Sequence, residues 1–194
     1  ESALAIERAR AAADASLVQD ARLVHAGVEV RCDRTPEGLA AAEALLRELP
    51  ADDPRAVEAR LVQAEALHHL GRLEEADAAL QAAMADTGPD DVARRAAILG
   101  ERVGIQFQRG ALADGLTLAT EAQAAFERCG DPVGAARMLT RVGTFAQALE
   151  RRAEAEAALT DARERLHRLH HVDGERGAIL NLAKRSEEHT SQLQ

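Results

Sequence analysis

The sequence predicts an all-α protein in which antiparallel helix pairs stack side by side as an α-solenoid. Three observations favour this fold: a hairpin pattern at Ala56–Ala85, a composition rich in helix formers, and a spacing of about forty residues between equivalent positions. Only 2% of the residues are aromatic, and β-branched residues are sparse beside alanine, leucine, arginine and glutamate. This composition favours helices and offers few side chains suited to strands.

The segment Ala56–Ala85 contains two amphipathic helices that meet at Gly71. Apolar residues at spacings of three and four mark these helices, at Val57, Leu61, Ala64, Leu67 and Leu70 and then at Leu73, Ala76, Ala79, Leu80 and Ala83. Gly71 is expected to end the first helix, because glycine adopts the left-handed conformation that closes a helix C-terminus. The short connection predicts an antiparallel pair. One such pair cannot bury both of its faces, so similar pairs are expected beside it.

Helix starts and stops divide the rest of the chain into comparable pieces. Ser16, followed by Gln19, has the pattern of a capping box and separates a partial repeat at 1–15 from a helix pair at 16–50. Further pairs are predicted at 53–87, 89–130 and 131–171, with proline or glycine at the breaks. A break at Val172–Gly174 is expected to precede a truncated helix within 173–184 that starts at Glu175.

Two columns of small residues give the register of the repeat. In the second helices the column is Gly38, Ala76, Gly115 and Ala155, at separations of 38, 39 and 40 residues. In the first helices the matching column is Ala26, Ala64, Gly143 and Ala183. Small residues at these positions would let the two helices of a pair approach closely, so the columns predict an internal repeat of helix pairs.

The last ten residues differ from the rest of the chain. Arg185–Gln194, RSEEHTSQLQ, changes abruptly to Ser, Thr, Gln and His, and it resembles a translated sequencing-library adapter with one residue changed. We therefore expect 185–194 to be a non-native tail and exclude it from the fold prediction. The chain also starts without methionine inside a predicted helix, so an internal piece of a longer protein is expected.

Charge and cysteine content narrow the classes of function. The net charge of −9 argues against binding of nucleic acid through this segment, because phosphates require a basic surface. No apolar run approaches the length of a membrane span. Cys32 and Cys129 stand far apart with no CxxC motif, which suits a reducing cytoplasmic compartment in which both thiols are small buried apolar groups.

The run Gly71–Leu80, GRLEEADAAL, resembles the turn and second-helix opening of a tetratricopeptide repeat (TPR). Val142-Gly143 and Leu182-Ala183 resemble the Leu-Gly pair in the first helix of that family. The resemblance covers 1–184 as about three full repeats flanked by two partial ones, and it implies a right-handed superhelix. Two features depart from the family: the period exceeds its usual 34 residues, and alanine and leucine fill its bulky aromatic positions.

The junctions Phe126–Leu139 and Val172–Ala183 are similar to the longer-repeat subgroup found in MalT-like and LuxR-type bacterial transcriptional regulators and related signalling ATPases. This resemblance implies a non-enzymatic interaction or sensing scaffold within a larger cytoplasmic regulator. Two alternatives stay open. The segment is the sensory array of a signalling enzyme such as a nucleotide cyclase, or it is a stand-alone assembly adaptor.

In the family the first helices line the inner wall of the superhelix. The resemblance therefore implies these groove candidates: Leu61, Glu65, His68, Phe107, Arg137, Thr140, Thr144, Gln147, Leu180 and Lys184. For each residue the alternative is an ordinary solvated helix face. The expected ligand is a protein or peptide segment, with a small effector as the alternative. Apolar stripes at both ends predict end-to-end self-association.

Motifs of catalysis are absent from the sequence. It contains no P-loop, no GxGxxG after a strand, no HExxH, no GxSxG and no EF-hand loop, so no catalytic residue and no cofactor is expected. His167, His170 and His171 have helical spacing that could surround a metal. No cysteine or carboxylate completes that pattern, so we favour a polar helix end, where histidine suits the C-terminal dipole, over a metal site.

Overall fold

The computed structural model describes the backbone of residues 2–50 and 53–192 and the side chains of residues 14–50 and 53–183. Within this part of the chain, all regular secondary structure is helical, which confirms the predicted all-α class. The chain divides into two compact units, Glu1–Gly88 and Pro89–Gln194. One continuous array through both units stays a prediction.

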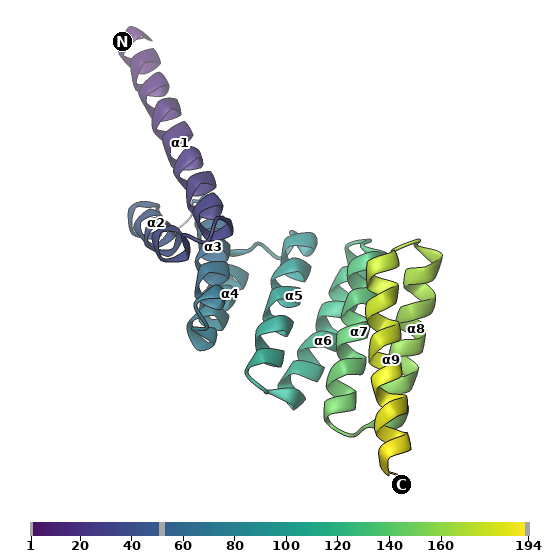
Figure 1. Ribbon diagram of the computed structural model, residues 1–194. Helices are drawn as coiled ribbons and strands as arrows, with labels where there is room; N and C mark the ends of the chain where they lie inside the picture. The colour runs from purple at the N-terminus through teal and green to yellow at the C-terminus, as the bar shows by residue number, and fades with distance from the viewer. Residues whose placement is uncertain (1, 51–52, 193–194) are drawn as a thin grey trace. The chain divides into compact units, whose positions relative to one another are not determined.

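Unit 1 is built from two helix pairs. Its helices are α1 (Ser2–Arg31), α2 (Thr35–Glu48), α3 (Arg55–His69) and α4 (Leu73–Asp86). Helix α1 pairs with α2 and α3 pairs with α4, while α3 also packs against both helices of the first pair (Figure 1). The α3–α4 pair is the predicted hairpin, and Gly71 has the expected left-handed conformation, with φ of 72°.

Helix α1 corrects the prediction of a break before Ser16. It runs without interruption from Ser2 to Arg31, and its N-terminal half extends past α2, which has 14 residues against 30 in α1 (Figure 1). The sequence from Ala11 to Ala21 contains no glycine or proline, and its alanines favour a continuous helix. Ser16 therefore lies inside the helix and not at its cap.

Unit 2 contains a sequential stack of five helices. They are α5 (Val92–Gln108), α6 (Leu112–Arg128), α7 (Pro132–Ala148), α8 (Arg152–Arg168) and α9 (Val172–Gln192). Each helix packs against the next in sequence, and the first helices α5, α7 and α9 also contact one another in that order (Figure 1). This arrangement of consecutive antiparallel helices is the one that an α-solenoid requires.

Helix α9 differs from the prediction at both ends. It starts at Val172, so the break lies at Leu169–His171 and not at Val172–Gly174, because His170 takes the left-handed conformation with φ of 54°. The helical backbone also continues past Lys184 to Gln192. That 185–194 is a non-native tail stays a prediction.

One type of turn connects most neighbouring helices. Three residues separate the paired helices of both units and every neighbouring pair of helices in unit 2. The central residue of each turn has φ between 54° and 77°, at Asp33, Gly71, Gly110, Gly130, Glu150 and His170. The third residue donates its N–H to the carbonyl five residues earlier, as from Arg72 to Leu67 at 2.9 Å, which is the Schellman motif. The turn recurs at 33, 71, 110 and 150, so it shares the period of the small-residue columns.

Glu150 is expected to strain its turn, and the substitution Glu150→Gly should relieve that strain. Its φ of 60° is close to the 70° of Gly110, the equivalent residue one pair earlier. A left-handed conformation costs a residue with a Cβ about 1 kcal/mol relative to glycine. The free energy of unfolding in urea should therefore rise by about 1 kcal/mol in the Glu150→Gly variant and fall by a similar amount in Gly110→Ala. A loss of stability in Glu150→Gly would contradict this account.

Every position of the small-residue columns except Ala183 is buried, as predicted for helix contacts. Gly38, Ala76, Gly115 and Ala155 are all buried. A Cβ at Gly38 would lie 2.5 Å from Cγ2 of Val30 and 2.9 Å from the carbonyl oxygen of Ala26, so α1 and α2 approach closely at this point. In the first-helix column Ala26, Ala64 and Gly143 are buried. Ala183 is exposed, because the described chain places no second helix after α9.

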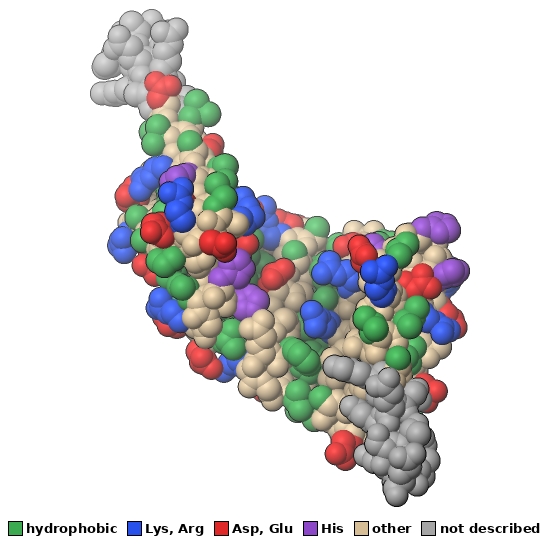
Figure 2. Space-filling view, in the orientation of Figure 1, with side chains coloured by type: hydrophobic (Ala, Val, Ile, Leu, Met, Phe, Trp, Pro, Cys, Tyr) green, Lys and Arg blue, Asp and Glu red, His purple; other side chains and the backbone are tan. Residues whose placement is uncertain are grey.

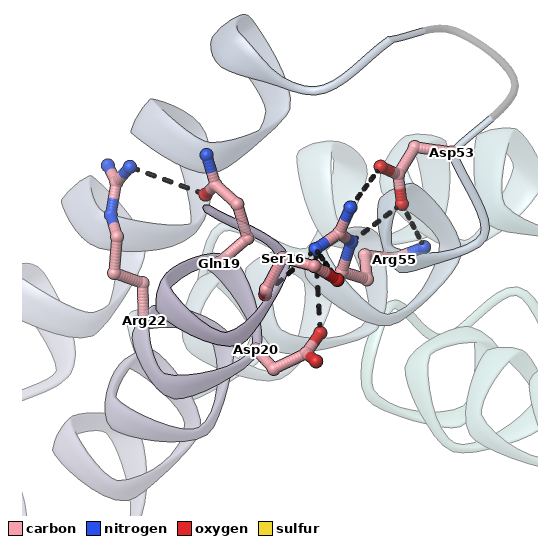
Figure 3. Close-up of polar contacts among 6 residues, drawn as sticks. All are labelled: Ser16, Gln19, Asp20, Arg22, Asp53 and Arg55. Atoms are coloured by element: carbon pink, nitrogen blue, oxygen red, sulfur yellow. Dashed lines mark hydrogen bonds and ion pairs between the residues drawn. The ribbon is translucent and has the colours of Figure 1, made fainter. Parts of the chain in front are cut away.

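Arg55 at the start of α3 ties the two pairs of unit 1 together (Figure 3). Its guanidinium donates to the carboxylate of Asp53 at 2.6 and 2.8 Å and to the carbonyl oxygen of Ser16 on α1 at 3.0 Å. The guanidinium hydrogen bonds to Asp53, followed by one from the backbone N–H of Arg55, lower the pKa of Asp53 below its ordinary value. Asp20 on α1 adds an ion pair with the same guanidinium at 3.6 Å.

The two cysteines correct a further expectation. Cys32 is exposed and Cys129 is half-buried, and both thiols are free. Each is the first residue of a three-residue turn, after α1 and after α6. Turns lie at the ends of helix pairs, where solvent reaches them, so the thiols are not the buried apolar groups that we predicted.

Candidate binding surface

The structure places the groove candidates on the first helices of both units. Leu61, Glu65 and His68 lie half-buried on α3 in unit 1, whereas the other candidates belong to unit 2. The unit 2 candidates are Phe107 on α5, Arg137, Thr140, Thr144 and Gln147 on α7, and Leu180 and Lys184 on α9. The side chain of Lys184 lies outside the described residues. A single groove through all ten positions therefore stays a prediction, and unit 2 holds the larger set.

Helix α7 forms the centre of the unit 2 surface, because it contacts α5 on one side and α9 on the other. At about 100° per residue, Thr140, Thr144, Arg137 and Arg141 follow one another around roughly 100° of the helix circumference. The two arginines are exposed and the two threonines are half-buried. Gln147 extends this face beyond Thr140 and is also half-buried.

The threonine side of α7 faces α9. The amide nitrogen of Asn181 on α9 donates to Oγ1 of Thr144 at 3.3 Å. The Thr144 hydroxyl donates to the carbonyl oxygen of Thr140 at 2.8 Å, and the Thr140 hydroxyl donates to that of Ala136 at 3.2 Å. Leu180, next to Asn181, keeps 60% of its surface exposed. The boundary between α7 and α9 thus combines hydroxyl and amide groups with an exposed leucine.

The arginine side of α7 faces α5. Phe145, fully buried, contacts the ring of Phe107 edge-on with centroids 5.6 Å apart. Arg141, one turn before Phe145, places its guanidinium carbon 6.0 Å from the centre of the Phe107 ring. That distance allows an attractive cation–π interaction. Phe107 is still 39% exposed, so an apolar ring and a cation lie together on the surface.

Arg137 and Arg141 differ from the ion-paired arginines of this acidic chain. Neither forms an ion pair with any residue that the structure describes, whereas Arg22, Arg55, Arg60 and Arg165 each contact a carboxylate. Helix α7 itself contains no aspartate or glutamate. Over the face of each unit in view in Figure 2, basic and acidic side chains are otherwise interspersed. The exposed face of α7 is therefore locally cationic in a chain of net charge −9.

Two residues of this surface were missed by the sequence analysis. Arg141 lies four residues after the candidate Arg137, and helical spacing alone would place it on the same face. Asn181 directly follows the candidate Leu180, but only the contact with Thr144 identifies its position. The remaining candidates in unit 2 with described side chains belong to the same three helices as predicted.

A second charged region joins α6 to α8. Arg165 contacts Glu127 on α6 at 2.7 Å and Asp161 on its own helix at 2.9 Å, beside an open hollow of about 540 Å³. The hydrogen bond from Arg165, followed by one from Gln123, lowers the pKa of Glu127 below its ordinary value. Here the cation is neutralised, so this region resembles a structural link between helices more than a binding surface.

The Arg165 link predicts a pH-dependent stability. The folded-state pKa of Glu127 is lowered, so the contact between Glu127 and Arg165 contributes to the free energy of unfolding above the unfolded pKa of about 4.3. This contribution is lost as the pH falls through the folded-state pKa. Arg165→Met should therefore lower the free energy of unfolding by about 0.5 kcal/mol at neutral pH, since both groups are partly exposed. The difference from wild type should vanish at acidic pH. Arg163→Met, at an exposed position of α8, is the control, and an equal loss at every pH would exclude this explanation.

The described residues include no group of three or more His, Cys, Asp or Glu that could hold a metal ion. His167 instead contacts Glu175 at 3.1 Å, and His171 accepts a hydrogen bond from the backbone of Gly174 at 3.0 Å. Among the helices that the structure describes, none has the length and apolarity that a membrane span requires.

Comparison with known proteins places the fold. No family model and no curated protein matches the chain. Among solved structures, it is similar to BtubC (BKLC) from P. vanneervenii, with a TM-score of 0.73, 16% identity, and coverage of 80% of this chain and 65% of that chain. It is also similar to aspartyl phosphate phosphatase F from Bacillus subtilis, with a TM-score of 0.76, 14% identity, and coverage of 90% and 48%. Both are TPR-like.

The fold is that of a helical-repeat protein. At 14–16% identity the likeness concerns the fold alone. The chain spans 65% and 48% of the lengths of the two similar proteins, so it corresponds to part of each of them.

Proposed function

We propose that this chain is a non-enzymatic scaffold that binds an acidic protein segment along the first helices of unit 2. The TPR-like fold of the similar structures supports a protein-binding role. The central observation is that α7 presents two exposed arginines that form no ion pair with any described residue, and no carboxylate, beside the half-exposed ring of Phe107.

The chemistry of this surface determines the partner. Arginine donates paired hydrogen bonds to carboxylates, so Arg137 and Arg141 suit aspartate or glutamate side chains. Phe107 and Leu180 offer apolar surface on either side of α7 for an aliphatic or aromatic side chain. The amide of Asn181 and the hydroxyl of Thr144 can bind backbone groups of an extended segment. An acidic segment with interspersed apolar residues fits all three features.

The resemblance to the longer-repeat subgroup supports a place within a cytoplasmic bacterial regulator. In that setting the array would hold a regulatory protein segment, while any DNA-binding or nucleotide-binding domain would belong to other parts of the protein. This assignment rests on the junctions Phe126–Leu139 and Val172–Ala183. The solved structures support the repeat fold and leave the subgroup as part of the proposal.

Fluorescence anisotropy with labelled peptides tests the proposal. The probes are a short peptide of alternating glutamate and leucine and its glutamine and lysine counterparts. We expect the glutamate peptide to bind most tightly, and the double variant Arg137→Gln/Arg141→Gln to weaken its binding at least about fivefold, the loss expected for two exposed charge-assisted contacts.

The matched control removes the same charge elsewhere on unit 2. Arg128→Gln/Arg163→Gln changes two exposed arginines on the second helices α6 and α8, so it reproduces any long-range electrostatic effect. Its affinity should stay near that of wild type. Equal weakening in both double variants, or equal affinity for the three peptides, would refute recognition by the α7 surface.

A further inference from the structure

The first helices of unit 2 share an N-terminal cap with one chemical exception. Asp91 accepts a hydrogen bond from the N–H of Arg94 at 3.1 Å before α5, and Asp131 accepts one from Gly134 at 2.8 Å before α7. At the same position before α9, forty residues after Asp131, His171 accepts the N–H of Gly174 through Nδ1 at 3.0 Å. An imidazole thus occupies the place of a carboxylate in the last of three equivalent caps.

The histidine in place of an aspartate makes the hydrogen bond of the cap depend on pH. A carboxylate accepts hydrogen bonds throughout the neutral and mildly acidic range, whereas an imidazole accepts only through a nitrogen that carries no proton. When the ring is protonated, both nitrogens are donors and the Gly174 N–H loses its acceptor. The added positive charge also lies at the positive end of the α9 dipole, which is unfavourable.

Packing around the ring leaves it little freedom to adapt in place. A Cβ on Gly174 would lie 2.7 Å from Nδ1 of His171 and 2.9 Å from Cδ2 of Leu166, so the ring and the leucine both pack on the first turn of α9. His171 is half-buried there, and its backbone N–H donates to the carbonyl oxygen of Leu166 at 3.0 Å. A protonated ring must therefore turn away from Gly174 and leave the first turn uncapped.

Neighbouring charged groups act in both directions. The turn and the helices around it carry these titratable or charged side chains: His167 and Arg168 on α8, His170 in the turn, Asp173, Glu175 and Arg176 on α9, and Asp131 and Arg137 at the start of α7. Asp131 already accepts the Gly134 N–H, and Glu175 already contacts His167 at 3.1 Å. Protonation of His167 would strengthen its contact with Glu175 and so hold α8 to α9. The two histidines therefore have opposite effects, and the experiment must separate them.

We propose that His171 makes the attachment of α9 pH-dependent, with the helix capped at neutral pH and its first turns released as the imidazole protonates. Release would loosen the helix that carries Asn181 beside Thr144, so acidification would open the α9 side of the α7 surface. The order of α9 can be measured without any partner, so this inference can be tested independently of the proposed binding function.

Amide hydrogen exchange of the full chain, corrected for the intrinsic pH dependence of exchange, tests the inference at about pH 7.5 and about pH 5.5. In wild type the opening of the first two turns of α9 should increase about fivefold at the lower pH, the factor expected for loss of one cap. His171→Asp, which restores the cap of α5 and α7, should abolish this increase. His167→Gln removes the opposing contact, so it should keep the increase or enlarge it.

The converse substitution, of the aspartate cap of α7 by histidine, provides the matched control. Asp131→His should give α7 the pH-dependent opening that wild-type α7 lacks. Unchanged opening of wild-type α9 between the two pH values, or an equal increase in wild type and His171→Asp, would overturn the inference. So would an increase that disappears in His167→Gln, since it would assign the effect to the other histidine.

Discussion

Replacement of Phe145 by alanine is expected to lower the free energy of unfolding of the chain by about 3–5 kcal/mol. Phe145 is fully buried on α7, where it contacts Phe107 of α5 edge-on. Its ring also fills the space over Gly115 of α6, where a Cβ would lie only 2.3 Å from Cε1. One side chain therefore joins three helices, and its removal leaves a cavity that none of them can fill alone.

Urea unfolding followed by circular dichroism measures this effect. The matched comparison is Phe107→Ala, which removes the same ring from a position that is 39% exposed and should cost clearly less. Gly115→Ala should also be destabilising in wild type, but nearly neutral in the Phe145→Ala background, because the ring that it would contact is gone. Additive effects of the two substitutions would mean that Phe145 does not lie against Gly115.

Replacement of Ala76 by leucine is the second large expected effect, a loss of about 1–3 kcal/mol from overpacking. Ala76 is fully buried on α4 in the second-helix column, and neighbours at this depth leave no room for the larger side chain. Ala78→Leu on the same helix is the control, because Ala78 is exposed. The melting temperature should fall in Ala76→Leu and stay nearly constant in Ala78→Leu. An unchanged melting temperature in Ala76→Leu would show that the hairpin register is wrong.

The helix pairs could be predicted from the sequence because local features, above all the glycines at the turns, mark where the helices end. Gly71, Gly110 and Gly130 all stand where the backbone turns left-handed, and glycine makes such turns recognisable. Asp33, Glu150 and His170 adopt the same conformation without that signal. For this reason the break before α9 was predicted three residues too late. The prediction took Gly174 as part of the break, whereas the left-handed residue of the turn is His170.

Contacts between helices were harder to foresee. The pairs Arg22–Glu48 and Arg60–Asp86 join first and second helices of unit 1 at the same separation of 26 residues. The sequence prediction took its register from the small residues and missed this periodic pairing of charges. The position of Arg141 over Phe107 depends on how α5 and α7 pack, which no single helix pattern specifies. The sequence therefore predicted the helices of the candidate surface and several of its residues, including Arg137. That Arg137 and Arg141 form no ion pair with any described residue emerged only from the structure.

Mapping the acidic glutamate–leucine peptide onto the chain by NMR tests the central claim most directly. If the first helices of unit 2 form the binding surface, the peptide should shift the backbone amides around Arg137, Thr140 and Thr144 on α7, together with those of Phe107 and Asn181. The chemical shifts of the backbone amides in the second helices α6 and α8 should stay unchanged. Shifts confined to α6 and α8, for instance beside the hollow at Arg165, would contradict the account.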